Sequence, residues 1–265
     1  MAAIDTHAHA FTLDAQWARG RRYTPDHAAP IADYLSRLDS AGVAQGVLVQ
    51  PSFLGTDNSY LLQCLAAWPD RLRGIAVVDP TCDEPAMAAM SAAHVVGLRL
   101  NLLGLDHGFV ADPDWQRLFG RAKDHDWQIE IHAIGNNIPF LVAALWPSGA
   151  NIVIDHFGRP DPAAGLADPG IKAMLARAAS GRIWIKLSGP YRCGGQPDLY
   201  ARAFLDAFGA DRLLWGSDWP WTQHSEGMTF AKALGWLSDW LPDEAVRHRV
   251  LDATPRALFG FAAGA

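Results

Sequence analysis

The chain has 265 residues, half of them hydrophobic, which is enough to bury one core of barrel size or two smaller ones. Its net charge of -6, from 22 basic and 28 acidic residues, includes no basic block, which excludes the electrostatic footprint of a nucleic-acid or membrane-surface binder. The three cysteines lack paired metal-ligand spacing, and neither an export signal nor an apolar run of bilayer length is present. We therefore expect a soluble cytoplasmic protein with reduced thiols.

The first predicted strand has the sequence Ile4-Asp5-Thr6-His7-Ala8-His9. Side chains alternate along a strand, so His7 and His9 share one face while Thr6 and Ala8 lie on the other. Two imidazoles held this close suit a divalent ion or the carbonyl group of a substrate. A chance pair of surface histidines is the alternative that this stretch alone leaves open.

From Val43 onward, short runs rich in Val, Ile and Leu alternate with stretches whose apolar residues recur at helical spacing. After residues 4–9, the runs lie at 46–50, 74–78, 95–100, 128–132, 151–156, 182–187 and 212–216. They make about eight strands, the number that a parallel (β/α)8 TIM barrel needs, so the predicted fold class is α/β.

Candidate helices lie between the strands, at 30–41, 58–68, 83–93, 113–124, 136–146, 170–180, 197–209 and 226–240. Asp112-Pro113 is a typical helix start, and Thr254-Pro255 predicts a last short helix that packs Leu258 and Phe259. Because no linker-like segment interrupts the pattern, we expect a single domain over residues 1–265. A doubly wound sheet also alternates strands and helices, but it usually has a glycine-rich phosphate turn where this chain has His-Ala-His.

Seven of the predicted strands end in polar residues. In order along the chain these residues are His7 and His9, Gln50 and Ser52, Arg99 and Asn101, His132, Asp155 and His156, Lys186 and Ser188, and Asp218. One such residue alone is usually an ordinary hydrogen-bonded core group, but chemistry in a TIM barrel takes place at the carboxyl ends of the strands. Taken jointly, the polar ends predict an active site.

Alternation along two strands supports this grouping. Gln128, Glu130 and His132 share one face of the fifth strand, and Trp184, Lys186 and Ser188 share one face of the seventh. The opposite faces carry isoleucine, leucine and tryptophan, which suit packing beneath helices. The polar faces are therefore expected to line the barrel interior.

The chain resembles the amidohydrolase superfamily through Asp5-Thr6-His7-Ala8-His9, His132, His156 and Asp218. Within it, the likeness is closer to the 2-pyrone-4,6-dicarboxylate hydrolases and related lactonases of the "amidohydrolase 2" group. The segments that carry this likeness run nearly end to end, at 22–25, 46–52, 55–58, 74–80, 97–101, 155–160, 186–189 and 216–220. The resemblance implies a barrel that opens a small anionic lactone.

The resemblance also implies roles at matching positions. Asp218 would act as the general base on water, while His7, His9 and His156 would polarise the lactone carbonyl or hold the leaving oxygen. Substrate carboxylates would be bound by Arg99 and Arg192, because a planar guanidinium binds a carboxylate through two parallel hydrogen bonds. The lesser candidates for substrate contacts are Gln50, Ser52, Asn101, Tyr23 and Tyr191.

His132 departs from the pattern of the pyrone dicarboxylate hydrolases, which, as the resemblance has it, work without a metal and have a non-ligand at this position. His7, His9, His132 and Asp218 make a set of three nitrogens and one oxygen that suits one Zn²⁺ or Mn²⁺ ion with room for a water. This set looks like that of the metal-dependent sulfomuconolactone hydrolases and carboxymuconate-semialdehyde decarboxylases. We expect one divalent ion, with His156 left as acid–base or oxyanion partner; a metal-free site is the alternative.

Three functions are consistent with these residues. The first is hydrolysis of an anionic lactone, which the segments at 22–25, 155–160 and 216–220 favour. The second is metal-dependent, non-oxidative decarboxylation of an aromatic or muconate-type acid, and the third is ligand binding without turnover. The expected partner is a small anionic substrate, in a monomer or a small homo-oligomer.

Overall fold

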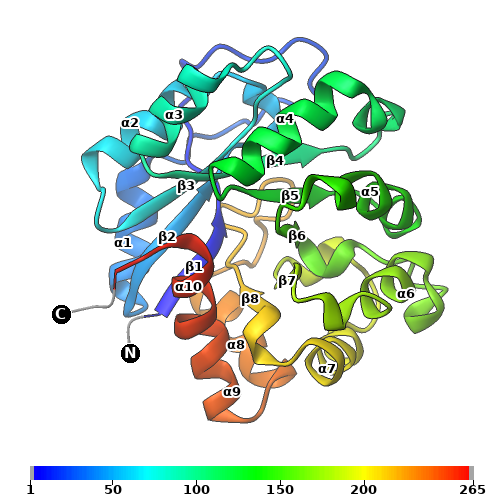
Figure 1. Cartoon of the computed structure of the whole chain (residues 1–265). Helices are drawn as coiled ribbons and strands as arrows, with labels where there is room; N and C mark the ends of the chain where they lie inside the picture. The colour runs from blue at the N-terminus through cyan, green and yellow to red at the C-terminus, as the bar shows by residue number, and fades with distance from the viewer. Residues whose placement is uncertain (1–2, 263–265) are drawn as a thin grey trace.

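The structure, a computed structural model, describes residues 3–262. Its eight strands are β1 (Ala3–Ala8), β2 (Val43–Val49), β3 (Leu72–Ala76), β4 (Val95–Asn101), β5 (Gln128–His132), β6 (Ile152–Ile154), β7 (Ile183–Leu187) and β8 (Leu213–Trp215). All seven neighbouring pairs are parallel, and the strands follow one another in sequence order around the sheet, as Figure 1 shows. The predicted TIM barrel is confirmed.

The barrel closes where the segment after β8 returns to β1. Ala8 pairs with Trp219 in an isolated parallel bridge, and the backbone N–H of Asp218 donates to the carbonyl of His7 over 2.9 Å. A Cβ atom on Gly216 would lie 2.5 Å from the Cβ of His7, so only glycine allows this approach. Closure therefore fixes Asp218 beside the first histidine of the His-x-His motif.

Helices follow the strands and surround the barrel (Figure 1). They are α1 (Ile31–Ser40), α2 (Ser59–Ala67), α3 (Glu84–Ala92), α4 (Pro113–Asp124), α5 (Ile138–Leu145), α6 (Pro169–Leu175), α7 (Pro197–Phe208), α8 (Phe230–Trp240), α9 (Glu244–His248) and α10 (Thr254–Phe259). All eight predicted helices and the short last one are present. No described helix is both long and apolar enough to cross a membrane.

The helix boundaries differ from the prediction at a few points. Helix α8 begins at Phe230 instead of residue 226, because the side chain of Thr229 accepts from the backbone N–H of Lys232 and so caps the helix there. Helix α6 ends at Leu175, and 3-10 geometry follows over Ala178–Ser180. Helix α9 was not predicted; Asp243 caps it by accepting from two backbone N–H groups.

The strands have an apolar outer face and, toward their carboxyl ends, a polar inner face; farther from those ends, apolar side chains such as Val153 and Trp184 fill the interior. Ile129 and Ile131 of β5 pack in the hydrophobic core beneath the helices. Glu130 of the same strand is fully buried and is bonded to Lys186 of β7, so both side chains lie inside the barrel. The interior thus carries charge where the strands approach their carboxyl ends.

Candidate active site

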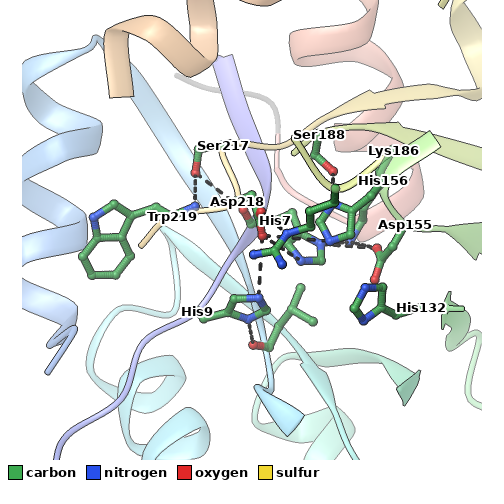
Figure 2. A network of polar contacts seen from close by, with 12 residues as sticks. His7, His9, His132, Asp155, His156, Lys186, Ser188, Ser217, Asp218 and Trp219 are labelled. Carbon is green, nitrogen blue, oxygen red and sulfur yellow. Dashed lines mark hydrogen bonds and ion pairs between the residues drawn. The ribbon is translucent and has the colours of Figure 1, made fainter. Parts of the chain in front are cut away.

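Three imidazoles converge on one carboxylate at the carboxyl ends of the strands (Figure 2). The Nε2 atoms of His7, His9 and His156 each lie 3.9 Å from Oδ1 of Asp218. All four side chains are buried, and the ring of His7 lies 5.0 Å from that of His9 and 4.8 Å from that of His156, centroid to centroid. Residues up to 211 positions apart in the chain therefore form one site.

Asp218 is held so that one of its oxygens is free. Oδ2 accepts from the Tyr191 hydroxyl and from Nε of Arg192, each over 2.6 Å, whereas Oδ1 has no hydrogen-bond partner among residues 3–262. Burial by itself would raise the pKa of Asp218, but the Arg192 guanidinium, with help from the imidazoles, holds it well below its ordinary value. The φ of Asp218 is 59°, a left-handed conformation of the kind that concentrates at functional sites.

Asp5 fastens the loop that carries Asp218. Its carboxylate accepts from the backbone N–H of Ser217 over 2.8 Å, from the Ser217 hydroxyl over 2.6 Å and from the Tyr34 hydroxyl over 3.0 Å. Burial raises the pKa of Asp5 to about 6, against these hydrogen bonds. Oδ1 of Asp5 also accepts from the backbone N–H of His7 over 3.1 Å, so Asp5 ties this loop to β1 and positions the base.

The tautomer of His9 follows from a single contact. Its Nδ1 lies 2.7 Å from the backbone carbonyl oxygen of Val49. A carbonyl oxygen only accepts, so Nδ1 carries the hydrogen, and Nε2 directs a lone pair toward Asp218. Burial lowers the pKa of His9 to about 4, which keeps the ring neutral near pH 7.

His156 is placed by a tight turn after β6. Its φ is 49°, and its Nδ1 lies 2.9 Å from the hydroxyl oxygen of Ser188. Gly189 follows Ser188 in the chain. A Cβ atom on Gly189 would lie 2.9 Å from Oδ2 of Asp218 and 3.1 Å from Nδ1 of His156. Burial lowers the pKa of His156 to about 3.

A network of buried charges lies beneath these histidines. Arg99 donates to Oδ2 of Asp155 through two nitrogens, over 3.1 and 2.8 Å, and Lys186 is paired with Glu130. Each of these four side chains is at most 3 % exposed. The sequence placed Asp155 and Lys186 at strand ends but gave neither a role, because only the closed barrel brings β4, β5, β6 and β7 together around His7.

The predicted metal ligands are only partly grouped. His7, His9 and Asp218 offer ligand atoms within 4.8 Å of one another, and so do His7, Asp155 and His156. His132 belongs to neither group: its Nδ1 lies 3.3 Å from Oδ1 of Asn101 and its Nε2 lies 3.4 Å from Nη1 of Arg159.

The first of these groups fits a cation. His9 Nε2 bears a lone pair, and His7 Nε2 and Asp218 Oδ1 have no hydrogen-bond partner in the described part of the chain. Nitrogen and carboxylate oxygen are donors that Zn²⁺ and Mn²⁺ accept. In the second group, Asp155 is already occupied by Arg99 and lies 3.5 Å from Nζ of Lys186, so a further cation there would be repelled.

A cavity of about 100 Å³ opens above Asp218. Its wall includes four arginines, Arg22, Arg99, Arg159 and Arg192, and Asp218 is the only carboxylate among the described residues that line it. Such an excess of guanidinium groups favours a substrate with carboxylates.

Most of the predicted substrate residues reach this cavity. Tyr23, Ser52, Arg99, Asn101 and Arg192 are in its lining. Gln50 is not; its side-chain amide donates to the carbonyl of Asp57 over 2.6 Å and so holds the loop after β2. Tyr191 is also outside the lining, and its hydroxyl is bonded to Asp218.

Five polar residues of the lining were not predicted as site residues. They are Arg22, Arg159, Thr222, Gln223 and His224. All come from loops, where no periodicity indicates which way a side chain points. The signal available for Arg22 and Arg159 was their place within the segments at 22–25 and 155–160 that carried the resemblance.

Known proteins resemble this chain over nearly its whole length. The protein-family model described as amidohydrolase matches residues 4–261. The chain is 32% identical over 271 residues to a 4-sulfomuconolactone hydrolase from Rhizobium radiobacter, and the match covers 97% of this chain and 90% of that protein.

Two solved structures are similar in fold and sequence. One, of a probable 2-pyrone-4,6-dicarboxylic acid hydrolase from Acinetobacter baumannii with citric acid bound, has a TM-score of 0.93 and 38% identity, over 98% of this chain and 100% of that one. The other, from Pseudomonas putida, carries the same provisional assignment, with a TM-score of 0.91 and 42% identity over 99% of both chains. These matches confirm the resemblance that the sequence motifs indicate.

Proposed function

Because the chain belongs to the amidohydrolase family, we propose that it hydrolyses a small lactone that carries carboxylate groups. The observation that carries this proposal is the free Oδ1 of Asp218, which faces three imidazoles at the floor of a cavity lined by arginines. A carboxylate base, hydrogen-bonding imidazoles and guanidinium groups are what water attack on an anionic lactone needs.

Asp218 and His9 together orient the attacking water. Both present acceptor atoms, Oδ1 and Nε2, which lie 3.9 Å apart. A water between them donates one hydrogen to each, and its oxygen is left to attack the carbonyl carbon. As the carbon–oxygen bond forms, Asp218 takes the first proton. This division gives His9 an accepting role in place of the carbonyl polarisation predicted from the sequence, because its Nδ1 hydrogen is bonded to Val49.

The carbonyl oxygen becomes negative as water adds, and hydrogen-bond donors must hold it. His7 and His156, whose Nε2 atoms face Asp218, are the donors we assign to this oxygen. Collapse of the tetrahedral intermediate breaks the bond to the ring oxygen, which receives the proton from Asp218. The products, on one open chain, are a hydroxyl or enol group and a carboxylic acid, which releases the second proton of the water to solvent and becomes a carboxylate.

The arginines select the substrate. Arg99 is paired with Asp155 and Arg192 with Asp218, which leaves Arg22 and Arg159 as the cavity guanidinium groups without a carboxylate partner in a described salt bridge. Arg192 also contacts Asp218, so a carboxylate bound there lies next to the reacting centre. A substrate with two carboxylates matches this excess of positive charge better than a neutral lactone does.

We also propose one divalent ion, Zn²⁺ or Mn²⁺, with His7, His9 and Asp218 as the residues that would hold it. When bound, such an ion would polarise the carbonyl and lower the pKa of a bound water toward about 7. His132, the predicted fourth ligand, stays a prediction; it lies outside the group and beside Arg159.

A substrate panel tests the reaction. The purified protein is assayed with a pyrone dicarboxylate, with a muconolactone and, for each of these, with a neutral lactone of matching ring size. Ring opening is followed by absorbance and by acid release. We expect turnover of the anionic lactones and little with the neutral ones. Release of CO₂ from aromatic or muconate-type acids, without lactone opening, would instead establish the decarboxylase alternative.

A further inference from the structure

The ring of His7 contacts three ionisable groups that the proposed reaction leaves without a role. Its Nδ1 lies 3.1 Å from Nζ of Lys186, 3.3 Å from Oδ1 of Asp155 and 3.6 Å from Oε1 of Glu130. Figure 2 shows Lys186 and Asp155 close to His7, on the inner side of the barrel. All four side chains are completely or almost completely buried, so water does not compete for these contacts.

Lys186 decides which nitrogen of His7 carries the hydrogen. An ammonium group has three donors and no acceptor, so in its hydrogen bond with Lys186 the Nδ1 of His7 must accept. A neutral imidazole then carries its single hydrogen on Nε2. Glu130 accepts from the same ammonium and holds it beneath the ring.

The two histidines of the His-x-His motif therefore present opposite groups to Asp218. His9 is bonded through Nδ1 to a carbonyl and presents a lone pair, whereas His7 is bonded through Nδ1 to an ammonium and presents an N–H. Their Nε2 atoms lie at the same distance, 3.9 Å, from Oδ1 of Asp218. A site with one acceptor and one donor beside the base can orient water and bind an oxyanion at once.

We propose that Lys186, fixed by Glu130, is a positioning residue that holds His7 as its Nε2–H tautomer, so that His7 donates to the oxygen that becomes negative during lactone opening. The tautomer rests on the hydrogen bond between Lys186 and His7, whatever the substrate. Only its effect on turnover rests on the proposed function.

The same contacts also allow the second tautomer of His7, with the hydrogen on Nδ1. Oδ1 of Asp155 and Oε1 of Glu130 are buried and have no hydrogen-bond partner in the described part of the chain. If Nδ1 carried the hydrogen, it would point at these carboxylates, and Nε2 would present a lone pair instead. A divalent ion at His7 and His9 requires this second tautomer, since a metal ligand needs the lone pair. A bound ion would therefore have to displace the hydrogen bond between Lys186 and His7.

The tautomer is measured directly by long-range ¹H–¹⁵N correlation spectra of the metal-free, uniformly labelled protein. His7→Gln identifies the His7 signals by their loss, and His9→Gln does the same for His9. We expect the Nε2–H pattern for His7 and the Nδ1–H pattern for His9 in the same spectrum. An Nδ1–H pattern for His7 in the wild-type protein would overturn the proposal, whatever the enzyme's substrate proves to be.

A double variant, Lys186→Met with Glu130→Gln, removes the ammonium without leaving a buried charge unpaired. His7 should change to the Nδ1–H pattern, and Zn²⁺ added alone should bind about tenfold more tightly, the lower end of what hydrogen-bond partners of ligands contribute. Unchanged His7 signals in the folded double variant would overturn the proposal. The matched control is Ser188→Ala, which removes the partner of His156 and should shift the His156 signals while His7 keeps its pattern.

Steady-state kinetics of the double variant, measured on a lactone that the wild-type protein hydrolyses, show how the tautomer of His7 affects turnover. Loss of one oxyanion donor lowers kcat by roughly a hundredfold or more, and KM should change little because neither residue lines the cavity. A changed KM with unchanged kcat would contradict the positioning role. If no lactone is a substrate, the proposed function fails, while the spectra still decide the tautomer.

Discussion

Arg192 donates from Nε to Oδ2 of Asp218 over 2.6 Å and leaves Oδ1 of that carboxylate free to face the imidazoles. The contact fixes which oxygen acts as the base. It also keeps Asp218 charged, because a buried carboxylate would otherwise take up a proton more readily. One ion pair thus both orients the base and keeps it ionised.

Replacement of Asp218 by Asn should leave the fold intact and remove the base. An amide has nearly the same shape, but it does not take a proton from water, so kcat should fall on the order of a hundredfold or more. KM should change much less, since the arginines that bind carboxylates remain. Steady-state kinetics with a circular dichroism check measure this, and turnover equal to wild type would exclude Asp218 from the mechanism.

Arg192→Met should move the acid limb of the pH–rate profile upward. In the wild-type protein the guanidinium holds the pKa of Asp218 below its ordinary value, so activity should not fall on account of this group above about pH 4. Without it, burial raises the pKa, and activity is lost as pH falls through the new value. Arg192→Lys keeps the charge and is the matched control; identical profiles for the Met and Lys variants would contradict the assignment.

Arg159→Met should weaken binding of a lactone with two carboxylates more than binding of one with a single carboxylate. Its guanidinium lines the cavity and is not engaged by any carboxylate in a described salt bridge. KM for the dicarboxylate should rise about tenfold or more, as expected when one charged pair is lost. Arg117→Met, on the exposed face of α4, is the control and should leave both KM values unchanged.

Metal removal tests the proposed divalent ion. After exhaustive chelation, the protein is assayed with and without added Zn²⁺ or Mn²⁺, and metal is counted per chain. An ion that takes part in the reaction predicts that activity falls on chelation and returns with about one equivalent of ion, whereas the donor role of His7 predicts that activity is kept. Full activity in metal-free protein would mean that the imidazoles and Asp218 suffice.

The stability of the metal-free protein should fall as pH is lowered from about 7 to 5. Unfolded imidazoles titrate near 6.5, whereas burial lowers the pKa of His9 to about 4 and that of His156 to about 3. Between these values the unfolded chain binds more protons than the folded one, so stability rises with pH and is lost on the acid side. Burial lowers the pKa values of His7 and His132 in the same direction.

Two carboxyl groups oppose this trend. Burial raises the pKa of Asp5 to about 6 and raises that of Glu130, so the folded state keeps protons that the unfolded state has released. Because four imidazoles oppose two carboxyl groups, the free energy of unfolding still decreases toward acid pH. Urea unfolding at several pH values, in chelator, measures the slope; His9→Gln should reduce it by about 1.4 kcal/mol per pH unit, while exposed His248→Gln should not.

The sequence by itself determined the fold and the positions of the strand-end residues. Alternation along a strand and recurrence along a helix are local properties, so they place His7 and His9 on one face and Glu130 on the inner face of β5 without any tertiary information. Because all strands of a parallel barrel end at one rim, His156 and Asp218 could also be assigned to that rim.

Only the tertiary structure decided what those side chains contact. Gln50 ends a strand as predicted, yet its amide is bonded to the loop after β2; His132 ends β5, yet it lies beside Asn101 and Arg159, outside the group of His7, His9 and Asp218. Of the four arginines in the cavity wall, Arg99 lies on β4, but Arg22, Arg159 and Arg192 come from segments between the strands and α-helices, where no periodicity indicates which way a side chain points. The hydrogen on His7 depends on Lys186, 179 positions away, because hydrogen bonds are set by distances of a few tenths of an ångström across a closed barrel, and no pattern along the chain records them.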